Sequence, residues 1–283
     1  MRKSQSSLTA AGIAVVRAVE SQRPANERIC YDPFARRFVP AWMYQAFGFF
    51  TKIGYTEWRG PGVNGFLVAR DRYIDDVLQN FLDGGLQQLV ILGAGYDARA
   101  YRFNLNGVKV FEVDHPATQS DKLAKLQTIF GKIPEHVTYV PVDFNTRTLE
   151  RCLLESGYDP RRKALFIWQG VTMYLSEDAV DTTLSFVVKH SAKGSAIVFD
   201  YIYRSVLDAQ KRSEVKGMRR YRFMTGEGLT FGIPDGMVET FLKERGFRHV
   251  KDANAEDLKA AYFTGKNARR AVAGGYGIVI GMI

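Results

Sequence analysis

Apolar residues follow two different periods along this chain, and the change comes near residue 86. Before it, apolar positions recur every three or four residues, as on a helix with one buried face. Phe66, Tyr73 and Phe81 share such a face, with charged residues between them. Asp32 before Pro33 is a typical helix start, because the carboxylate can cap the helix and proline loses no hydrogen bond there. We therefore predict helices over residues 8–21, 33–50 and 64–82.

After residue 86, short apolar runs alternate with helical stretches, as in "QLVILG" and "SAIVFDY". Strands separated by helices indicate an α/β fold with a mostly parallel sheet and helices on both faces. Only a short helix and a basic turn separate the last two runs, so we expect one of them to run antiparallel at the sheet edge. The predicted strands cover residues 88–93, 108–114, 136–143, 163–170, 195–201, 247–253 and 275–283.

The sequence shows no sign of a boundary between domains. We find no internal repeat, no low-complexity tract and no linker rich in Pro, Gly and Ser. A chain of 283 residues also suits one large α/β domain. We predict a single domain, 1–283, in three parts: a helical arm or lid over 1–85, a core of 86–203 and 232–283, and a cap over 204–231 inserted after the fifth strand.

Composition narrows the class of protein. Apolar residues make up 46% of the chain, but no uncharged apolar run approaches the length of a membrane span, so we expect a soluble protein with no membrane contact. Cys30 and Cys152 stand far apart without metal-ligand spacing, which predicts no metal site and a reducing, cytoplasmic location. A net charge of +9 favours acidic substrates or polyanions.

Chemistry-bearing residues stand at the ends of the predicted strands, where parallel sheets bind their ligands. Gly93 and Gly95 follow the first strand and leave the backbone open to a ligand. Asp114 ends the second strand, about 20 residues further on, a spacing that suits contact with a ribose diol. The third and fourth strands end in Asp143, Phe144 and Gln169.

Two cofactors compete for this layout. The stretch "GAGYDA" fits the relaxed dinucleotide pattern G-x-G-x-x-A, and Asp114 also fits a site for NAD. A pyrophosphate on this turn would, however, lie beside the carboxylate of Asp97. S-adenosylmethionine carries a sulfonium and an ammonium instead, and its one carboxylate could be held by Arg70 on the preceding helix. The acidic residue therefore favours the methyl donor over the hydride carrier.

With these residues, the chain resembles a known family of S-adenosylmethionine-dependent O-methyltransferases. The family contains the leucine carboxyl methyltransferases, related bacterial methyltransferases and polyketide carboxyl methyltransferases such as the tetracenomycin enzyme. The stretches that carry the resemblance cover most of residues 8 to 250: "RAVESQRPANERICYDPFARRFV", "VARDRYIDDVL", "LVILGAGYDARAYRF", "VFEVDHPATQSDKL", "WQGVTMYLSEDAV" and "GIPDGMVETFLKERGF".

The resemblance implies a class I methyltransferase, with a Rossmann-like seven-stranded sheet, and a secondary metabolite as substrate. It also implies roles for single residues. Arg70 would bind the cofactor carboxylate, and Gly93 would pack against the methionine part. Asp114 would take the ribose hydroxyls, and Asp143 with Phe144 would flank the adenine.

One position departs from the family pattern. Where relatives usually have a glutamate in "EGxxMYL", this chain has Gln169, which removes a charge expected near the cofactor's amino group. An amide oxygen still accepts a hydrogen bond, but without the added charge the bond is weaker. Two alternatives therefore remain beside the methyltransferase: a non-catalytic or repurposed S-adenosylmethionine-binding protein, and an NAD(P)-dependent oxidoreductase.

Motifs that are absent from the sequence indicate the kind of methyl acceptor. No histidine stands in a motif that would place a base opposite the cofactor, which favours an acceptor that is already ionised, a carboxylate or an acidic hydroxyl. No adjacent prolines occur, against the pattern of methyltransferases that act on base nitrogens. We expect a small acidic, partly aromatic acceptor and no nucleic acid partner, and the oligomeric state stays open. The candidate acceptor-binding residues are Tyr174, Tyr201, Tyr203 and Arg204, of which the last two are also weak catalytic candidates.

Overall fold

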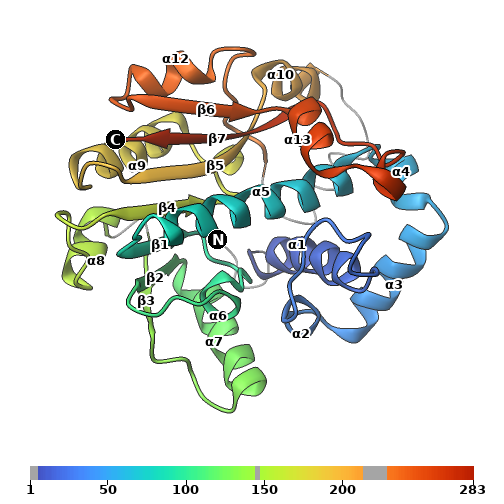
Figure 1. Cartoon of the computed structure of the whole chain (residues 1–283), viewed down its shortest axis with the longest axis horizontal. Helices are drawn as coiled ribbons and strands as arrows, with labels where there is room; N and C mark the ends of the chain where they lie inside the picture. The colour runs from blue at the N-terminus through green and yellow to red at the C-terminus, as the bar shows by residue number, and fades with distance from the viewer. Residues whose placement is uncertain (1–5, 144–146, 213–227) are drawn as a thin grey trace.

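A computed structural model of the protein describes residues 6–143, 147–212 and 228–283. A seven-stranded sheet forms its centre, in the order β3-β2-β1-β4-β5-β7-β6 (Figure 1). The strands are β1 (Gln88–Leu92), β2 (Lys109–Asp114), β3 (Val137–Pro141), β4 (Ala164–Trp168), β5 (Ala196–Ile202), β6 (His249–Ala253) and β7 (Tyr276–Met282). All seven predicted strands are confirmed, and so is the mostly parallel sheet.

The direction of the last strand confirms one half of a prediction and corrects the other. β7 runs antiparallel to both β5 and β6, as expected for one of the last two strands. It lies between them, however, and β6 forms the edge. The side chains explain this order. β7 carries buried Ile278 and Val279, whereas β6 is largely exposed and carries Lys251 and Asp252, charges typical of a protected sheet edge.

Helices cover both faces of the sheet. On one face, apolar residues of α5 (Val63–Asp83) and α13 (Ala255–Tyr262) pack against Leu89, Ile91 and Ile167 of the strands. On the other face, α8 (Leu149–Glu155), α9 (Glu177–Lys189) and α12 (Val238–Lys243) pack against Val90, Phe166 and Phe199. Alternate residues of the same strands therefore belong to two separate hydrophobic cores, because successive side chains of a strand point to opposite faces of the sheet. Three further helices follow β1, β2 and β5: α6 (Arg99–Arg102), α7 (Pro116–Phe130) and α10 (Arg204–Arg212).

The segment before the sheet is helical, as predicted, but more divided. α1 (Ser6–Ser21) and α5 match two predicted helices. The third prediction, one helix over 33–50, is wrong: α2 (Ala35–Phe38) and α3 (Ala41–Lys52) are separate. Val39 is extended there, with φ −109° and ψ 144°, because Pro40 disfavours helical backbone in the residue before it. A further short helix, α4 (Tyr55–Arg59), was not predicted.

The predicted division into arm, core and cap stays a prediction. Residues 213–227 of the proposed cap lie outside the described residues, and α10 begins the segment. Among the helices that the structure describes, none combines the length and the apolar composition needed to cross a membrane.

Candidate functional site

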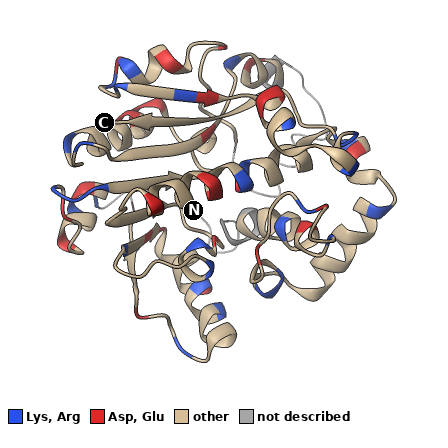
Figure 2. Ribbon diagram, in the orientation of Figure 1, with Lys and Arg blue, Asp and Glu red and all other residues tan. Residues whose placement is uncertain are grey.

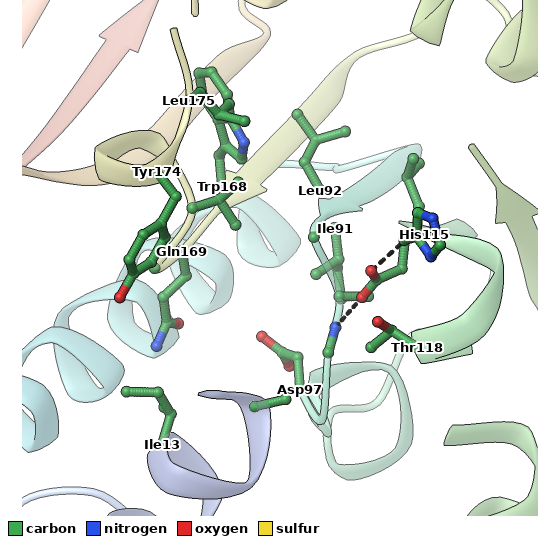
Figure 3. Close-up of a pocket in the computed structure, with 18 of the residues that line it drawn as sticks. Ile13, Ile91, Leu92, Asp97, His115, Thr118, Trp168, Gln169, Tyr174 and Leu175 are labelled. Atoms are coloured by element: carbon green, nitrogen blue, oxygen red, sulfur yellow. Dashed lines mark hydrogen bonds between the residues drawn. The ribbon is translucent and has the colours of Figure 1, made fainter. Parts of the chain in front are cut away.

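A cavity of about 500 Å³ opens at the carboxyl ends of β1, β2 and β4 (Figure 3). The strand order reverses at this point, because the chain moves from β1 outward to β3 and then returns to β4 on the other side. Such reversals create the crevice in which α/β sheets bind ligands. α1 closes the cavity opposite the sheet with Ala10, Ile13 and Arg17.

The glycine turn after β1 forms the floor of the cavity. Gly93 and Gly95 both have positive φ angles, 65° and 41°, which side chains rarely tolerate. A Cβ atom on Gly93 would also overlap the side chain of Val171. The turn therefore requires glycine at position 93 for both its backbone conformation and its packing.

Asp114 connects the end of β2 to this turn. Its Oδ2 accepts a hydrogen bond from the Gly95 N–H at 2.5 Å, and its Oδ1 accepts one from the His115 N–H at 2.6 Å (dashed in Figure 3). Burial raises the pKa of Asp114 above its ordinary value, against the effect of these two donors. Each oxygen retains a lone pair, so a neighbouring pair of hydroxyls could donate to both.

Asp97 brings a fixed negative charge to the cavity wall. Its side chain points into the same space as those of Gln169 and Tyr174 (Figure 3). Burial by itself would raise the pKa of Asp97, but Arg99 and Arg17 outweigh it and lower the pKa to about 2. Arg99 binds the carboxylate directly through Nη1, and its backbone N–H donates to Oδ1 at 2.7 Å. The carboxylate is therefore ionised at neutral pH and favours a cationic ligand.

Arg70 lines the cavity from α5 and offers free donors. Only 2% of the residue is exposed. Its Nη1 donates to Asp200 Oδ2 at 2.6 Å, while the other oxygen of Asp200 accepts from the Gly170 N–H at 2.6 Å. Nε and Nη2 of Arg70 are buried without a hydrogen-bond partner. Burying a hydrogen-bond donor without a partner costs free energy, so these two nitrogens suit the carboxylate of a bound ligand.

Gln169 is held between a cation and an anion. Its Oε1 accepts from Arg99 Nη1 at 2.8 Å, and its Nε2 donates to Asp71 Oδ1 at 3.2 Å. A glutamate here could accept from Arg99, but it would place a second carboxylate oxygen against Asp71. The amide thus suits its two neighbours, which gives a structural reason for the departure from the family pattern.

The structure brings most of the predicted cofactor residues together. Seven of the predicted site residues line the cavity: Arg70, Gly93, Gly95, Asp97, Asp114, Gln169 and Tyr174. Asp143 does not line it, although the preceding Val142 does. Phe144 lies outside the described residues.

Three predicted acceptor-binding residues do not reach the cavity. Tyr201 is 1% exposed, and its hydroxyl donates to Asp252 on the neighbouring sheet edge. Tyr203 packs against the Tyr201 ring, and Arg204 donates through Nε to the Gly232 carbonyl. Tyr201 belongs to β5, and the alternation of side chains along this strand directs it into the core. The acceptor-binding roles of these three residues stay a prediction.

The sequence interpretation expected a helical arm or lid but named no residue of α1. Ile13 and Arg17 line the cavity, and Arg17 donates to Asp32 Oδ2 and to the Tyr96 carbonyl. The signal was an arginine on the apolar face of a helix, which implies a buried partner. His115 also lines the cavity, but its Nδ1 accepts the Ala117 N–H and caps α7.

Comparisons with known proteins identify the class of this site. The model of the leucine carboxyl methyltransferase family matches residues 10–188, more than half of the chain. The Bacillus subtilis protein YktD, whose name assigns it to the S-adenosyl-L-methionine-dependent methyltransferases, is 33% identical over 202 residues. That match covers 70% of this chain and 66% of YktD. A similarly named Streptomyces coelicolor protein, SCO7813, is 31% identical over 212 residues, 74% of each chain.

A solved structure agrees with the fold. A Thermobifida fusca protein described as a methyltransferase superposes with a TM-score of 0.53, at 16% identity, over 95% of this chain and 93% of that one. Fold, cavity and sequence similarity together define a class I S-adenosylmethionine-dependent methyltransferase. The chain belongs to the leucine carboxyl methyltransferase family, and its cofactor is S-adenosylmethionine. The alternative of a nicotinamide cofactor is therefore wrong.

Proposed function

We propose that this methyltransferase transfers a methyl group to an oxygen, either a carboxylate or an acidic hydroxyl, of a small molecule of secondary metabolism. The observation that carries the proposal is that no carboxylate or imidazole in the described wall of the cavity is without a partner. A neutral alcohol or phenol acceptor requires proton removal, whereas an ionised oxygen does not.

The carboxylates and the imidazole of that described wall belong to Asp97, Asp114 and His115, and each is engaged. Asp97 is held by Arg99, and its pKa of about 2 makes it a weak base. Asp114 accepts two backbone N–H groups, and in this proposal its remaining lone pairs accept from the ribose hydroxyls of the cofactor. His115 accepts the Ala117 N–H through Nδ1, so this nitrogen is engaged in capping α7.

The contribution of the protein is therefore binding and orientation. Bound S-adenosylmethionine supplies the electrophilic methyl group. Arg70 offers its two unpartnered nitrogens to the cofactor carboxylate, and Asp97 attracts the cationic end. Asp114 accepts from the ribose hydroxyls, while α1 excludes water from the opposite side. Holding the reactants in line in this way can supply much of the rate enhancement.

The experiment uses radiolabelled S-adenosylmethionine and a panel of aromatic carboxylates, acidic hydroxyl compounds, neutral phenols and amines. A methyl ester releases volatile methanol in alkali, whereas a methyl ether is stable and remains with the product. The proposal expects label on a carboxylate or an acidic hydroxyl. Label only on nitrogen or carbon, or only on neutral phenols, would contradict it.

A second candidate function is a non-catalytic or repurposed S-adenosylmethionine-binding protein. The observation that favours it is Gln169, which leaves the family's charge missing. This alternative expects tight binding of S-adenosylhomocysteine and no methylated product from any member of the panel. A single acceptor with steady turnover would exclude it.

The proposed acceptor is acidic and partly aromatic, and no nucleic acid or membrane partner is included. The net charge of +9 and the ring of Tyr174 on the cavity wall support this choice. We also propose a cytoplasmic location, which the two buried, unpaired cysteines Cys30 and Cys152 support.

A further inference from the structure

The exposed apolar residues of this protein are concentrated in one place. Among the described residues, eleven large apolar side chains are exposed, and six of them fall within α3, α4 and the turn between these helices. We call these six the aromatic patch: Trp42 (67% exposed), Phe49 (60%), Phe50 (42%), Ile53 (57%), Tyr55 (44%) and Trp58 (73%). None of them lines the cofactor cavity.

Four of the six side chains are connected by ring contacts. Phe49 contacts Phe50 with ring centroids 5.7 Å apart, Phe50 contacts Tyr55 at 5.2 Å, and Tyr55 contacts Trp58 at 5.7 Å. Trp42 and Ile53 lie on the same side of α3 as Phe49, because they are seven residues before it and four after it. Figure 1 places α3 and α4 at one end of the molecule, beyond the sheet. Figure 2 shows α3 almost without charged residues along its length.

The size of the patch exceeds what a monomer usually exposes. With about 200 Å² for a fully exposed large side chain, the exposed fractions correspond to roughly 700 Å² of apolar surface. The largest apolar patch of a typical monomer is about 300–600 Å². A standard protein interface takes about 800 Å² from each partner, so two such patches facing each other would bury nearly the area of a stable dimer.

We infer that the aromatic patch is the contact surface of a homodimer, in which two copies meet through α3 and α4 about a two-fold axis. Tryptophan and tyrosine are also the residues that carry most binding energy at interfaces. The rim supports a second copy over a lipid surface, because it carries both signs of charge: Lys52, Glu57 and Arg59. A two-fold axis can bring opposite charges together, whereas a surface of anionic lipids would match the two cations but not Glu57.

The direct test is sedimentation of the full-length protein, without cofactor or acceptor, from 1 to 100 µM. We expect a species of twice the monomer mass of 31.9 kDa that dissociates on dilution. A monomer throughout this range would overturn the inference. So would a monomer that co-sediments with vesicles of anionic phospholipid, since the patch would then be a lipid-binding surface.

The variant Phe49→Ser/Trp58→Ser tests the surface itself. Both side chains are more than half exposed, so their loss leaves the core intact. We expect the dissociation constant of the dimer to rise at least about 100-fold, the effect of two central interface residues. Trp42→Ser, a milder change, should raise it at least about 10-fold. A dimer unaffected by both variants would contradict the assignment of this surface.

A matched control is Ile133→Ser/Met237→Ser, which removes two exposed apolar side chains outside the patch (41% and 46% exposed). It should sediment as the wild type does; a monomeric control would show that the dimer uses another surface. Binding of S-adenosylhomocysteine, measured by calorimetry, reports folding of every variant. Because the mass is measured without any reaction, a failure of this inference is separate from a failure of the proposed O-methylation.

Discussion

The ionised carboxylate of Asp97 is the feature that most clearly makes the cavity suited to a cation, and Asp97→Asn tests it. The wild-type pKa falls from its ordinary value of 3.8 to about 2, because Arg99 and Arg17 outweigh the effect of burial. At about 1.4 kcal/mol per pKa unit, this shift corresponds to about 2 kcal/mol of folding stability at pH 7. The side chain of Asp97 is 11% exposed, so solvent screening reduces this figure little.

The pH dependence gives the prediction its sign. The pKa of Asp97 is lower in the folded protein, so its stabilising contribution is complete above about pH 4 and is lost as the pH falls through about 2. Asp97→Asn should therefore lower the free energy of unfolding by about 2 kcal/mol at pH 7 and pH 5. The difference from the wild type should shrink to about 1 kcal/mol at pH 3.

Urea denaturation at pH 7, 5 and 3 measures these differences. The matched control is Asp83→Asn, which changes an exposed carboxylate at the end of α5 and should alter stability by less than about 0.5 kcal/mol. A difference of 2 kcal/mol that did not shrink at low pH would show that the variant acts through packing and not through charge. A variant as stable as the wild type at pH 7 would refute the charge assignment altogether.

Three further predictions concern ligand binding, stability and turnover. Arg70→Lys keeps the charge beside Asp200 but loses the two guanidinium nitrogens that are free to bind a carboxylate. Calorimetry should therefore show about 10- to 100-fold weaker binding of S-adenosylhomocysteine. Binding within twofold of the wild type would contradict the carboxylate site. Asp114→Ala removes the acceptor for the ribose and should weaken the same binding at least about 10-fold, and an unchanged enthalpy and affinity would rule out that role. Gln169→Glu places a carboxylate against Asp71, so urea denaturation should show that the free energy of unfolding falls by about 1–3 kcal/mol. Rate measurements should show no gain in turnover. A faster or more stable variant would mean that the amide is a defect.

The strands and the glycine turn were predictable because local composition determines them. Apolar runs of strand length stand out from the helices between them, and Gly93 follows the first run directly. The break between α2 and α3 was also readable, since the residue before Pro40 cannot easily stay helical, but helical periodicity on both sides concealed it. The place of β7 inside the sheet was readable as well, since its run is apolar and the run of β6 carries the charges of an edge strand, but the prediction did not use this contrast.

Residues that depend on contacts far apart in the sequence were harder to predict. Arg70 was assigned to the cavity, but its partner Asp200 is 130 residues away and was not identified. Gln169 was read as a lost charge until its bonds to Arg99 and Asp71 gave the amide a function. In both cases the missing information was the distance between side chains on different elements, which the spacing of residues along the chain does not contain.

A crystal structure grown with S-adenosylhomocysteine and NAD⁺ together tests most directly whether charge selects the ligand of this cavity. We predict the thioether ligand beyond β1, β2 and β4, with its carboxylate on Arg70, its ammonium near Asp97 and its ribose on Asp114. A pyrophosphate bound on the turn of Gly93 and Gly95, or the thioether ligand bound elsewhere, would contradict this prediction.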